Sequence, residues 1–162
     1  MKNTQDILYN KENELLKKSV VEINKKCGKK NLDCSTTKRI IYIIEKYLKD
    51  NKYICYGGTA INNILPKSKQ FYKKNIDLPD YDFFSPNAYD DAKRIAEHYY
   101  DEGFDEVEAK AGVHFGTYKI FVNFISIADI TQMDLPIFNI LKKNSILVND
   151  IYYADPNYLR MA

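Results

Sequence analysis

The sequence contains little cysteine, and its spacing does not match a metal site. Its three cysteines are Cys27, Cys34 and Cys55, an odd number without the short paired spacing of zinc ligands. Cys27 and Cys34 flank a six-residue loop and could form a disulfide bond. We favour free thiols in a reducing compartment for all three.

The sequence also lacks tryptophan, a signal peptide, a lipidation motif and any apolar run long enough to cross a membrane. We therefore expect an intracellular, cytoplasmic protein without membrane contact. A large charge of either sign is missing too, because 24 basic and 22 acidic residues leave a net charge of +2. This balance excludes a histone-like polycation, but it leaves room for a local basic patch that binds nucleic acid.

The length and overall composition are those of a globular domain. A chain of 162 residues is about one domain and can bury a real core. Hydrophobic residues make up 45% and charged residues 28%, both ordinary values, whereas 14 Tyr and 8 Phe give a high aromatic content.

Helix signals dominate the first third of the chain. Apolar residues recur at helical spacing over residues 3–26, which predicts an amphipathic helix. We expect it to pack on its own domain, the alternative being a partner surface or a homodimer contact. Ser35 can cap a second helix that is apolar nearly all round from Ile40 to Leu48, so this helix is expected to back a sheet. We assign 1–34 to an N-terminal helical extension and 35–162 to the main domain.

The later pattern is mixed α+β, with helices around a small sheet. The expected elements are, in order, a helix over 85–103, a strand over 105–109, a long and bent strand over 115–130, a short helix from 135, a strand at 146–148 and a helix after 155. Asp90, Asp91 and Glu97 are expected on a solvated face of the first of these helices.

A glycine pair follows the first short strand, Tyr53–Tyr56. Gly57 and Gly58 come next, and a helix signal then runs from Thr59 to Leu65. Glycine permits positive φ and close approach of a phosphate, while a helix N-terminus directs free amides and the positive end of its dipole to the same point. A glycine pair by itself is more often an ordinary turn.

Two aspartates follow about twenty residues later, in a second predicted strand. Asp80 and Asp82 would share one face, with Cα atoms roughly 6.5–7 Å apart. Adjacent carboxylates repel each other unless a cation lies between them, and Mg²⁺ is typically held by one or two carboxylates plus substrate phosphates. Alone, such a pair is more often a solvated strand edge. Together with the glycine pair, it predicts a site for a metal-bound nucleoside triphosphate.

Two further features leave alternatives open. The loop Lys67–Lys74 is basic and holds two aromatic residues. It can steer phosphates and stack a base, or it can be a solvated lysine loop, and the sequence favours neither. His114 is a lone histidine and is more often a structural hydrogen-bonding residue than a catalyst.

The order strand, Gly-Gly, helix, loop and Asp-x-Asp strand resembles the palm of DNA polymerase β-type nucleotidyltransferases. Three segments narrow the resemblance to the poly(A) polymerase catalytic subunits of large DNA viruses, of the mimivirus, megavirus and asfarvirus type. They are Tyr-Gly-Gly-Thr-Ala-Ile-Asn from Tyr56, Leu-Pro-Asp-Tyr-Asp-Phe-Phe-Ser from Leu78, and Gly-Val-His-Phe-Gly-Thr-Tyr-Lys from Gly112. The resemblance covers roughly residues 50–162.

This resemblance implies transfer of AMP from ATP to the 3′-hydroxyl of RNA, with release of pyrophosphate. Asp80 and Asp82 would hold two Mg²⁺ or Mn²⁺ ions, and the amides of Gly57, Gly58 and Thr59 would bind phosphate oxygens. The implied partners are ATP, an RNA 3′ end and a viral processing partner. The implied location is the cytoplasm of an infected cell, or the virion.

One residue departs from the superfamily pattern. A third acidic residue usually sits mid-strand between apolar neighbours, and the matching segment here, Val122–Ile125, carries Asn123 instead. We rank catalysis with Asn123 and two carboxylates first, recruitment of Asp129 by a distorted strand second, and nucleotide binding without good catalysis third. Lys119 shares the face of Asn123 by parity and is a candidate phosphate ligand, or an exposed edge lysine.

Other functions stay open. The resemblance implies relatives that continue into a second domain, so we expect the C-terminal domain of the family to be absent. The chain is then either a fragment or a short stand-alone relative with weakened or changed activity. The runner-up enzyme is a minimal nucleotidyltransferase that modifies a protein or a small molecule. From another class, the chain would be a non-catalytic module for nucleotide binding and assembly.

Overall fold

The computed structural model describes residues 14–15, 17–19, 35–72 and 77–161. The helix expected over 3–26 falls largely outside these ranges, and Cys27 and Cys34 fall entirely outside them. Cys55 is a free, buried thiol, as expected. No helix of the described ranges is long and apolar enough to cross a membrane.

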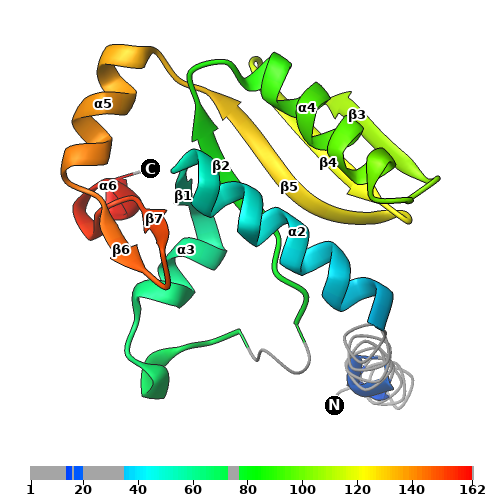
Figure 1. The fold of residues 1–162 in the computed structure, drawn as a ribbon. Helices are drawn as coiled ribbons and strands as arrows, with labels where there is room; N and C mark the ends of the chain where they lie inside the picture. The colour runs from blue at the N-terminus through cyan, green and yellow to red at the C-terminus, as the bar shows by residue number, and fades with distance from the viewer. Residues whose placement is uncertain (1–13, 16, 20–34, 73–76, 162) are drawn as a thin grey trace, which may run out of the picture.

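A seven-stranded mixed sheet organises the described residues (Figure 1). Its strands are β1 (Ile54–Tyr56), β2 (Tyr81–Ser85), β3 (Val107–Ala111), β4 (Thr117–Val122), β5 (Ile125–Gln132), β6 (Ile146–Val148) and β7 (Ile151–Tyr153). Their order across the sheet is β3-β4-β5-β2-β1-β7-β6. β2 pairs in parallel with β5, and β1 with β7, while the other neighbours are antiparallel. β2 and β5 therefore lie side by side at the centre.

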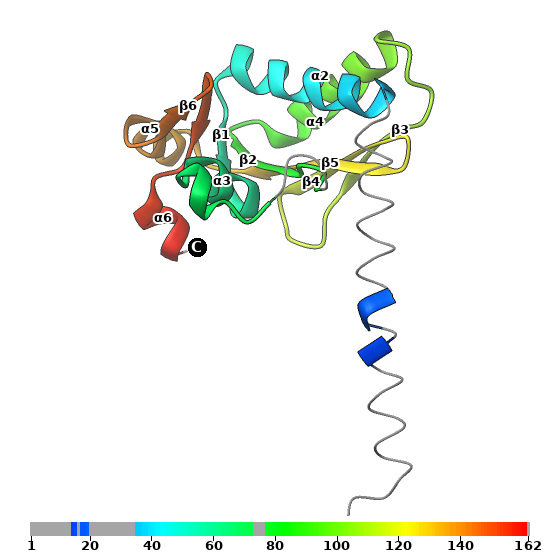
Figure 2. The ribbon, with the colours of Figure 1, turned by 90° about the horizontal axis from the view of Figure 1, so that it is seen from below.

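Helices cover the two faces unequally. The helices are α2 (Ser35–Asn51), α3 (Gly57–Ile64), α4 (Ala88–Asp101), α5 (Leu135–Lys143) and α6 (Pro156–Met161), with a short 3₁₀ turn, η1 (Lys67–Lys69). Figure 2 shows α2 and α4 together on one face of the sheet, while α3 and α6 lie towards the other side. Within the described ranges, that other face carries no helix over β4 and β5.

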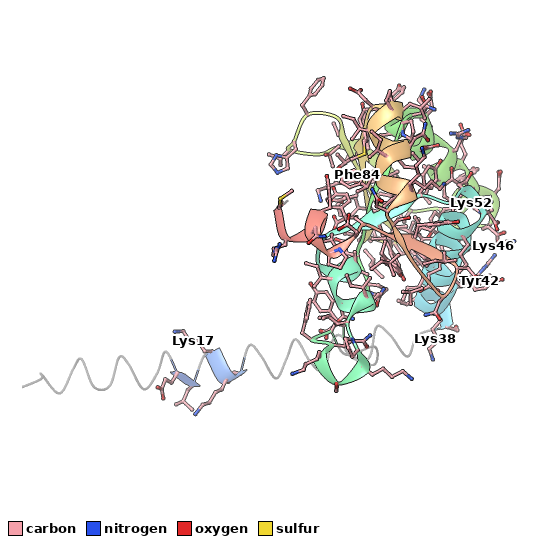
Figure 3. All side chains as sticks on the ribbon, turned by 90° about the vertical axis from the view of Figure 1, so that its left-hand side faces the viewer. Lys17, Lys38, Tyr42, Lys46, Lys52 and Phe84 are labelled. Atoms are coloured by element: carbon pink, nitrogen blue, oxygen red, sulfur yellow. The ribbon has the colours of Figure 1, made fainter. Side chains whose placement is uncertain are left out.

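The core lies between the sheet and the helices α2 and α4. Helix α2 buries the apolar side chains of Ile40, Ile43, Ile44 and Leu48, and each such burial contributes about 1.5–3 kcal/mol. Its opposite face, with Tyr42 and Lys46, projects into solvent (Figure 3). The prediction that this helix backs the sheet is confirmed, although the helix is amphipathic rather than apolar all round.

The prediction of one long strand over 115–130 is wrong. The chain reverses at Asn123 and Phe124, which have φ angles of +50° and +63°, as in a two-residue hairpin turn of type I′. The segment is therefore an antiparallel hairpin of β4 and β5. The other predicted elements after residue 85 are present, and the structure adds β7, which the sequence did not predict.

The solvated position expected for Asp91 is also wrong. Its carboxylate is 1% exposed because the first turn of α4 folds back onto the end of β2. There Ser85 Oγ donates to Asp91 Oδ2, and Arg94 donates to Asp91 Oδ1. The buried charge is thus paired and hydrogen-bonded, as a buried carboxylate requires.

Candidate active site

A glycine elbow connects β1 to α3 and lies against Asp82. Gly57 has a φ angle of +72°, which a side chain disfavours. A Cβ atom at this position would also lie 2.2 Å from Asp82 Oδ2, well inside van der Waals contact. Both the backbone and the neighbouring carboxylate therefore require glycine. The helix begins here, two residues earlier than predicted.

The N-terminus of α3 is not capped by a side chain. Its N-cap residue, Tyr56, makes no side-chain capping hydrogen bond, so the first-turn amides keep their capacity to bind an anion. Thr59, in this first turn, donates through Oγ1 to the carbonyl oxygen of Asp80 at 2.7 Å. This bond ties the helix start to the residue that leads into β2, and it joins the two motifs found in the sequence.

Asp82 and Asp129 are direct neighbours on the central parallel strands. The register pairs Asp82 of β2 with Asp129 of β5, and neighbouring strands lie about 4.8 Å apart. On the far side of Asp129, the register pairs it with Lys119 of β4, and Lys119 Nζ donates to Asp129 Oδ2. Asp129 Oδ1 is buried and makes no hydrogen bond.

Asp80 completes the acidic group from just outside β2. It is exposed, and Ser126 Oγ lies at 3.5 Å from its Oδ2. The β4–β5 register shifts by one residue, so that Phe121 pairs with Ser126 while Lys119 still pairs with Asp129. This shift turns the side chain of Ser126 towards Asp80. A β-bulge of this kind re-aims a side chain next to a site.

Burial and mutual repulsion disfavour the ionised form of the carboxylates in this site. Burial, followed by repulsion from Asp80 and then from Asp129, raises the pKa of Asp82 to about 6. Loss of solvent and the charge of Asp129 also raise the pKa of Asp80. The ammonium of Lys119 works in the other direction on both carboxylates. A cation at this place would relieve the repulsion.

The residues present fit a hard divalent cation. Carboxylate oxygens are the ligands that Mg²⁺ and Mn²⁺ prefer, and the unpartnered Asp129 Oδ1 has capacity for one. Within the described ranges, however, no three His, Cys, Asp or Glu side chains converge closely enough to hold one ion as they stand. An ion held here by one or two of the carboxylates would take its remaining ligands from substrate phosphates or water.

Part of the basic loop is anchored beside the elbow. Asn62 is 3% exposed, and its Oδ1 accepts the backbone N–H groups of Phe71 at 2.9 Å and Tyr72 at 2.8 Å. The Tyr72 hydroxyl consequently lies 2.7 Å from where a Cβ of Gly58 would be. A cavity of about 310 Å³ is lined by Gly58, Tyr72 and Asp82, among others. Asn62 ends the first of the three motif segments, but sequence reasoning assigned it no role, because the backbone groups that it binds lie in a loop whose conformation the sequence does not indicate.

An aromatic cluster closes the other side of the acidic group. Phe84, two residues after Asp82, stacks on Tyr56 with ring centroids 4.0 Å apart and meets Tyr158 edge-on at 5.8 Å. The Tyr56 hydroxyl shares a 2.7 Å hydrogen bond with Thr131 Oγ1. Phe84 is buried inside the domain (Figure 3), so this cluster fixes the strands that carry the aspartates.

The structure brings most of the predicted site residues together, but not Asn123. Those that meet at one place are Gly57, Gly58, Thr59, Asp80, Asp82 and Lys119. The prediction that Asn123 stands mid-strand is wrong, because it lies in the β4–β5 turn and its N–H donates to Glu106 O at 2.8 Å. Asp129, ranked second, is the residue beside Asp82. The hairpin turn brings Asp129 back along β4, and the shift in the β4–β5 register lies between that turn and Asp129.

Comparison with known proteins assigns the family. The model of the family "Poly(A) polymerase catalytic subunit" matches residues 42–162. The chain belongs to this family. Among its curated relatives, a putative poly(A) polymerase catalytic subunit of Acanthamoeba polyphaga mimivirus is 32% identical over 122 residues, which is 74% of this chain. One from African swine fever virus (strain Badajoz 1971 Vero-adapted) is 30% identical over 119 residues, or 73% of this chain.

A solved structure of the family has the same fold. The Megavirus polyadenylate synthase superposes with a TM-score of 0.77 at 27% identity over 91% of this chain. The mixed α+β nucleotidyltransferase palm expected from the sequence is thereby confirmed. The chain spans only 31% of that structure, and 20% and 24% of the mimivirus and African swine fever virus relatives.

Proposed function

We propose that this chain is a nucleotidyltransferase palm that transfers AMP from ATP to the 3′-hydroxyl of RNA, with release of pyrophosphate. The observation that carries the proposal is the side-by-side register of Asp82 and Asp129, with the glycine elbow packed against Asp82. Membership in the poly(A) polymerase family supports the choice of ATP and RNA as substrates.

In this proposal Asp80, Asp82 and Asp129 hold Mg²⁺ or Mn²⁺. Bound ions of this kind lower the pKa of an attacking hydroxyl and neutralise a leaving pyrophosphate. Asp129 supplies a third carboxylate at the position for which the sequence analysis ranked Asn123, with two carboxylates only, first. The buried, unpartnered oxygen of Asp129 supports this assignment.

The elbow and the start of α3 bind the triphosphate. The amides of Gly57, Gly58 and Thr59 are directed at phosphate oxygens, and the helix dipole favours their charge. Thr59 keeps its hydroxyl on Asp80 O, so it holds the helix and the metal-binding strand in register. The catalytic contribution of these groups is positioning and charge neutralisation rather than covalent chemistry.

The acceptor side favours a polymer over a small molecule. Beyond Asp129, the sheet continues through Lys119 and Phe121 of β4 as a face that no helix of the described ranges covers. An open, partly basic face suits an RNA backbone, whereas a small acceptor is better served by an enclosed pocket.

The experiment is a tailing assay with labelled ATP, Mn²⁺ and an oligo(A) primer, combined with calorimetric titration of Mn²⁺. We expect wild type to tail the primer and to bind Mn²⁺, and we expect Asp82→Asn and Asp129→Asn each to lose both properties. Asn123→Gly is the control, because glycine suits the positive φ of this turn. It should leave tailing and Mn²⁺ binding unchanged.

Three results would count against the proposal. Tailing that persists in Asp82→Asn would remove the site from the reaction. Tailing that survives in Asp129→Asn but disappears in Asn123→Gly would show that Asn123, and not Asp129, is the third site residue. Absence of both Mn²⁺ binding and tailing in wild type would favour a non-catalytic module.

A further inference from the structure

We propose that Lys119 is a built-in counter-ion that competes with the divalent metal for Asp129 and is released towards the triphosphate when nucleotide binds. This inference rests on the proposed function, because it assumes that Asp129 is a metal ligand. It adds an expectation that the family assignment does not contain: metal alone binds weakly, and metal and nucleotide strengthen each other's binding.

The first observation is how Lys119 and Asp129 share their contacts. The two residues face each other across the antiparallel pair of β4 and β5, and the ammonium donates to Asp129 Oδ2. The side chain of Asp129 is 16% exposed and that of Lys119 is 34% exposed. The second oxygen, Asp129 Oδ1, is buried and makes no hydrogen bond. Lys119 thus binds one oxygen of the Asp129 carboxylate, and the other oxygen has no hydrogen-bond partner.

The second observation concerns the charges around the acidic group. Asp82 and Asp129 are register partners, yet no three carboxylates of the described ranges converge on one point. The ammonium of Lys119 interacts with Asp129 and, at longer range, with Asp80 and Asp82. Lys119 therefore supplies the positive charge that the site needs when no metal is bound.

The consequence is an exchange of partners. A divalent ion that binds Asp129 must take over Oδ2 from the ammonium or tolerate a like charge beside it, and both reduce its affinity. A triphosphate on the elbow offers the released ammonium a new partner of opposite charge. Nucleotide thus removes the competition, and by linkage metal raises the affinity for nucleotide by the same factor.

The test compares Mn²⁺ affinity in wild type, Lys119→Met and Lys110→Met by calorimetry or electron paramagnetic resonance. Lys110 is the matched control because it faces Lys119 in the β3–β4 register and pairs with Glu108 at 2.9 Å rather than with an aspartate of the site. We expect Lys119→Met to bind Mn²⁺ about tenfold more tightly than wild type without nucleotide, and Lys110→Met to match wild type.

Two further measurements separate competition from simple positioning. Without metal, Lys119→Met should unfold at a lower temperature than wild type, because Asp129 loses its partner, and saturating Mn²⁺ should restore the loss. A non-hydrolysable ATP analogue should increase Mn²⁺ affinity in wild type, and by a clearly smaller factor in Lys119→Met.

Several outcomes would overturn the inference. Unchanged or weaker Mn²⁺ binding in Lys119→Met would show that Lys119 only positions Asp129, and if Asp82→Asn still abolished binding, the proposed function would survive. An equal increase of Mn²⁺ affinity in Lys110→Met would show that the effect comes from the loss of any nearby positive charge. Absence of Mn²⁺ binding in wild type, Lys119→Met and Lys110→Met alike would overturn both this inference and the proposed metal site.

Discussion

Replacing Gly57 with alanine tests whether the elbow sets the position of Asp82. The added methyl group acts in two ways that the structure separates. The φ angle of +72° costs an alanine about 1–2 kcal/mol in the left-handed region. The new Cβ also meets Asp82 Oδ2 at 2.2 Å, and real Cβ contacts essentially never fall below 3.0 Å, so this gap must open by at least about 0.8 Å.

Gly103→Ala isolates the first of these effects. Gly103 follows α4 with a φ angle of +86°, and a Cβ there would meet nothing within 4 Å. It therefore carries a comparable backbone cost without touching the site. We expect both variants to lose about 1–2 kcal/mol of unfolding free energy, with Gly57→Ala at the upper end.

The two variants should differ sharply in function. A displacement of about 1 Å in a catalytic group can cost about 100-fold in rate, so Gly57→Ala should lose about 10- to 100-fold in Mn²⁺ affinity and in tailing. Gly103→Ala should lose neither. Urea unfolding measures the stability change, and calorimetry and the primer assay measure the functional one. Normal Mn²⁺ binding in Gly57→Ala, or an equal loss in Gly103→Ala, would refute the reasoning.

Two more predictions concern stability around the same site. The pKa of Asp82 is raised to about 6 from the ordinary 3.8, so the folded, metal-free protein binds more protons than the unfolded chain between these values. Its stability should therefore fall as pH rises from about 4 to about 6, by about 1–2 kcal/mol after allowance for solvent screening. Asp82→Asn should remove this contribution from urea unfolding curves measured across that pH range; an unchanged slope would contradict the assignment. Asn62→Ala removes the acceptor of two backbone N–H groups and should destabilise the domain by about 1–3 kcal/mol. Asn62→Asp keeps an acceptor oxygen and should be milder in the same measurement, whereas equal losses would show that Oδ1 is not what matters.

The sequence predicted the parts of the site that are local in the chain. The glycine pair and the Asp-x-Asp strand each lie within a few residues, and their conformations follow from the special backbone freedom of Gly57 and from strand alternation around Asp82. Helix α2 was also predictable, because Ser35 can cap it and apolar residues are frequent from Ile40 to Leu48. The order of these elements indicated the nucleotidyltransferase superfamily, and the residues of three segments narrowed the resemblance to the poly(A) polymerase family.

The sequence named Asp129 only as the second candidate for the third site residue, because its position depends on a turn with a weak sequence signal. Two-residue hairpins are usually marked by Asn-Gly or Asp-Gly, and here Phe124 occupies the second position with a φ angle of +63°. Without that turn, a continuous strand places Asn123 in its middle and Asp129 about 20 Å from Asn123. Asp91 was misjudged for a related reason, since its partner Ser85 lies on the preceding strand rather than on the helix.

The topology of the sheet explains why one aspartate is hidden from motif reading. β2 and β5 are parallel neighbours, and parallel strands cannot be joined by a tight turn. The crossover here consists of α4, β3 and β4, so Asp82 and Asp129 are adjacent in space but separated by three elements in the chain. A residue brought in by such a crossover depends on the register of the whole sheet. The pairing of Asp129 with Lys119 on the next strand depends on the same register, which places the proposed counter-ion beside the proposed third carboxylate.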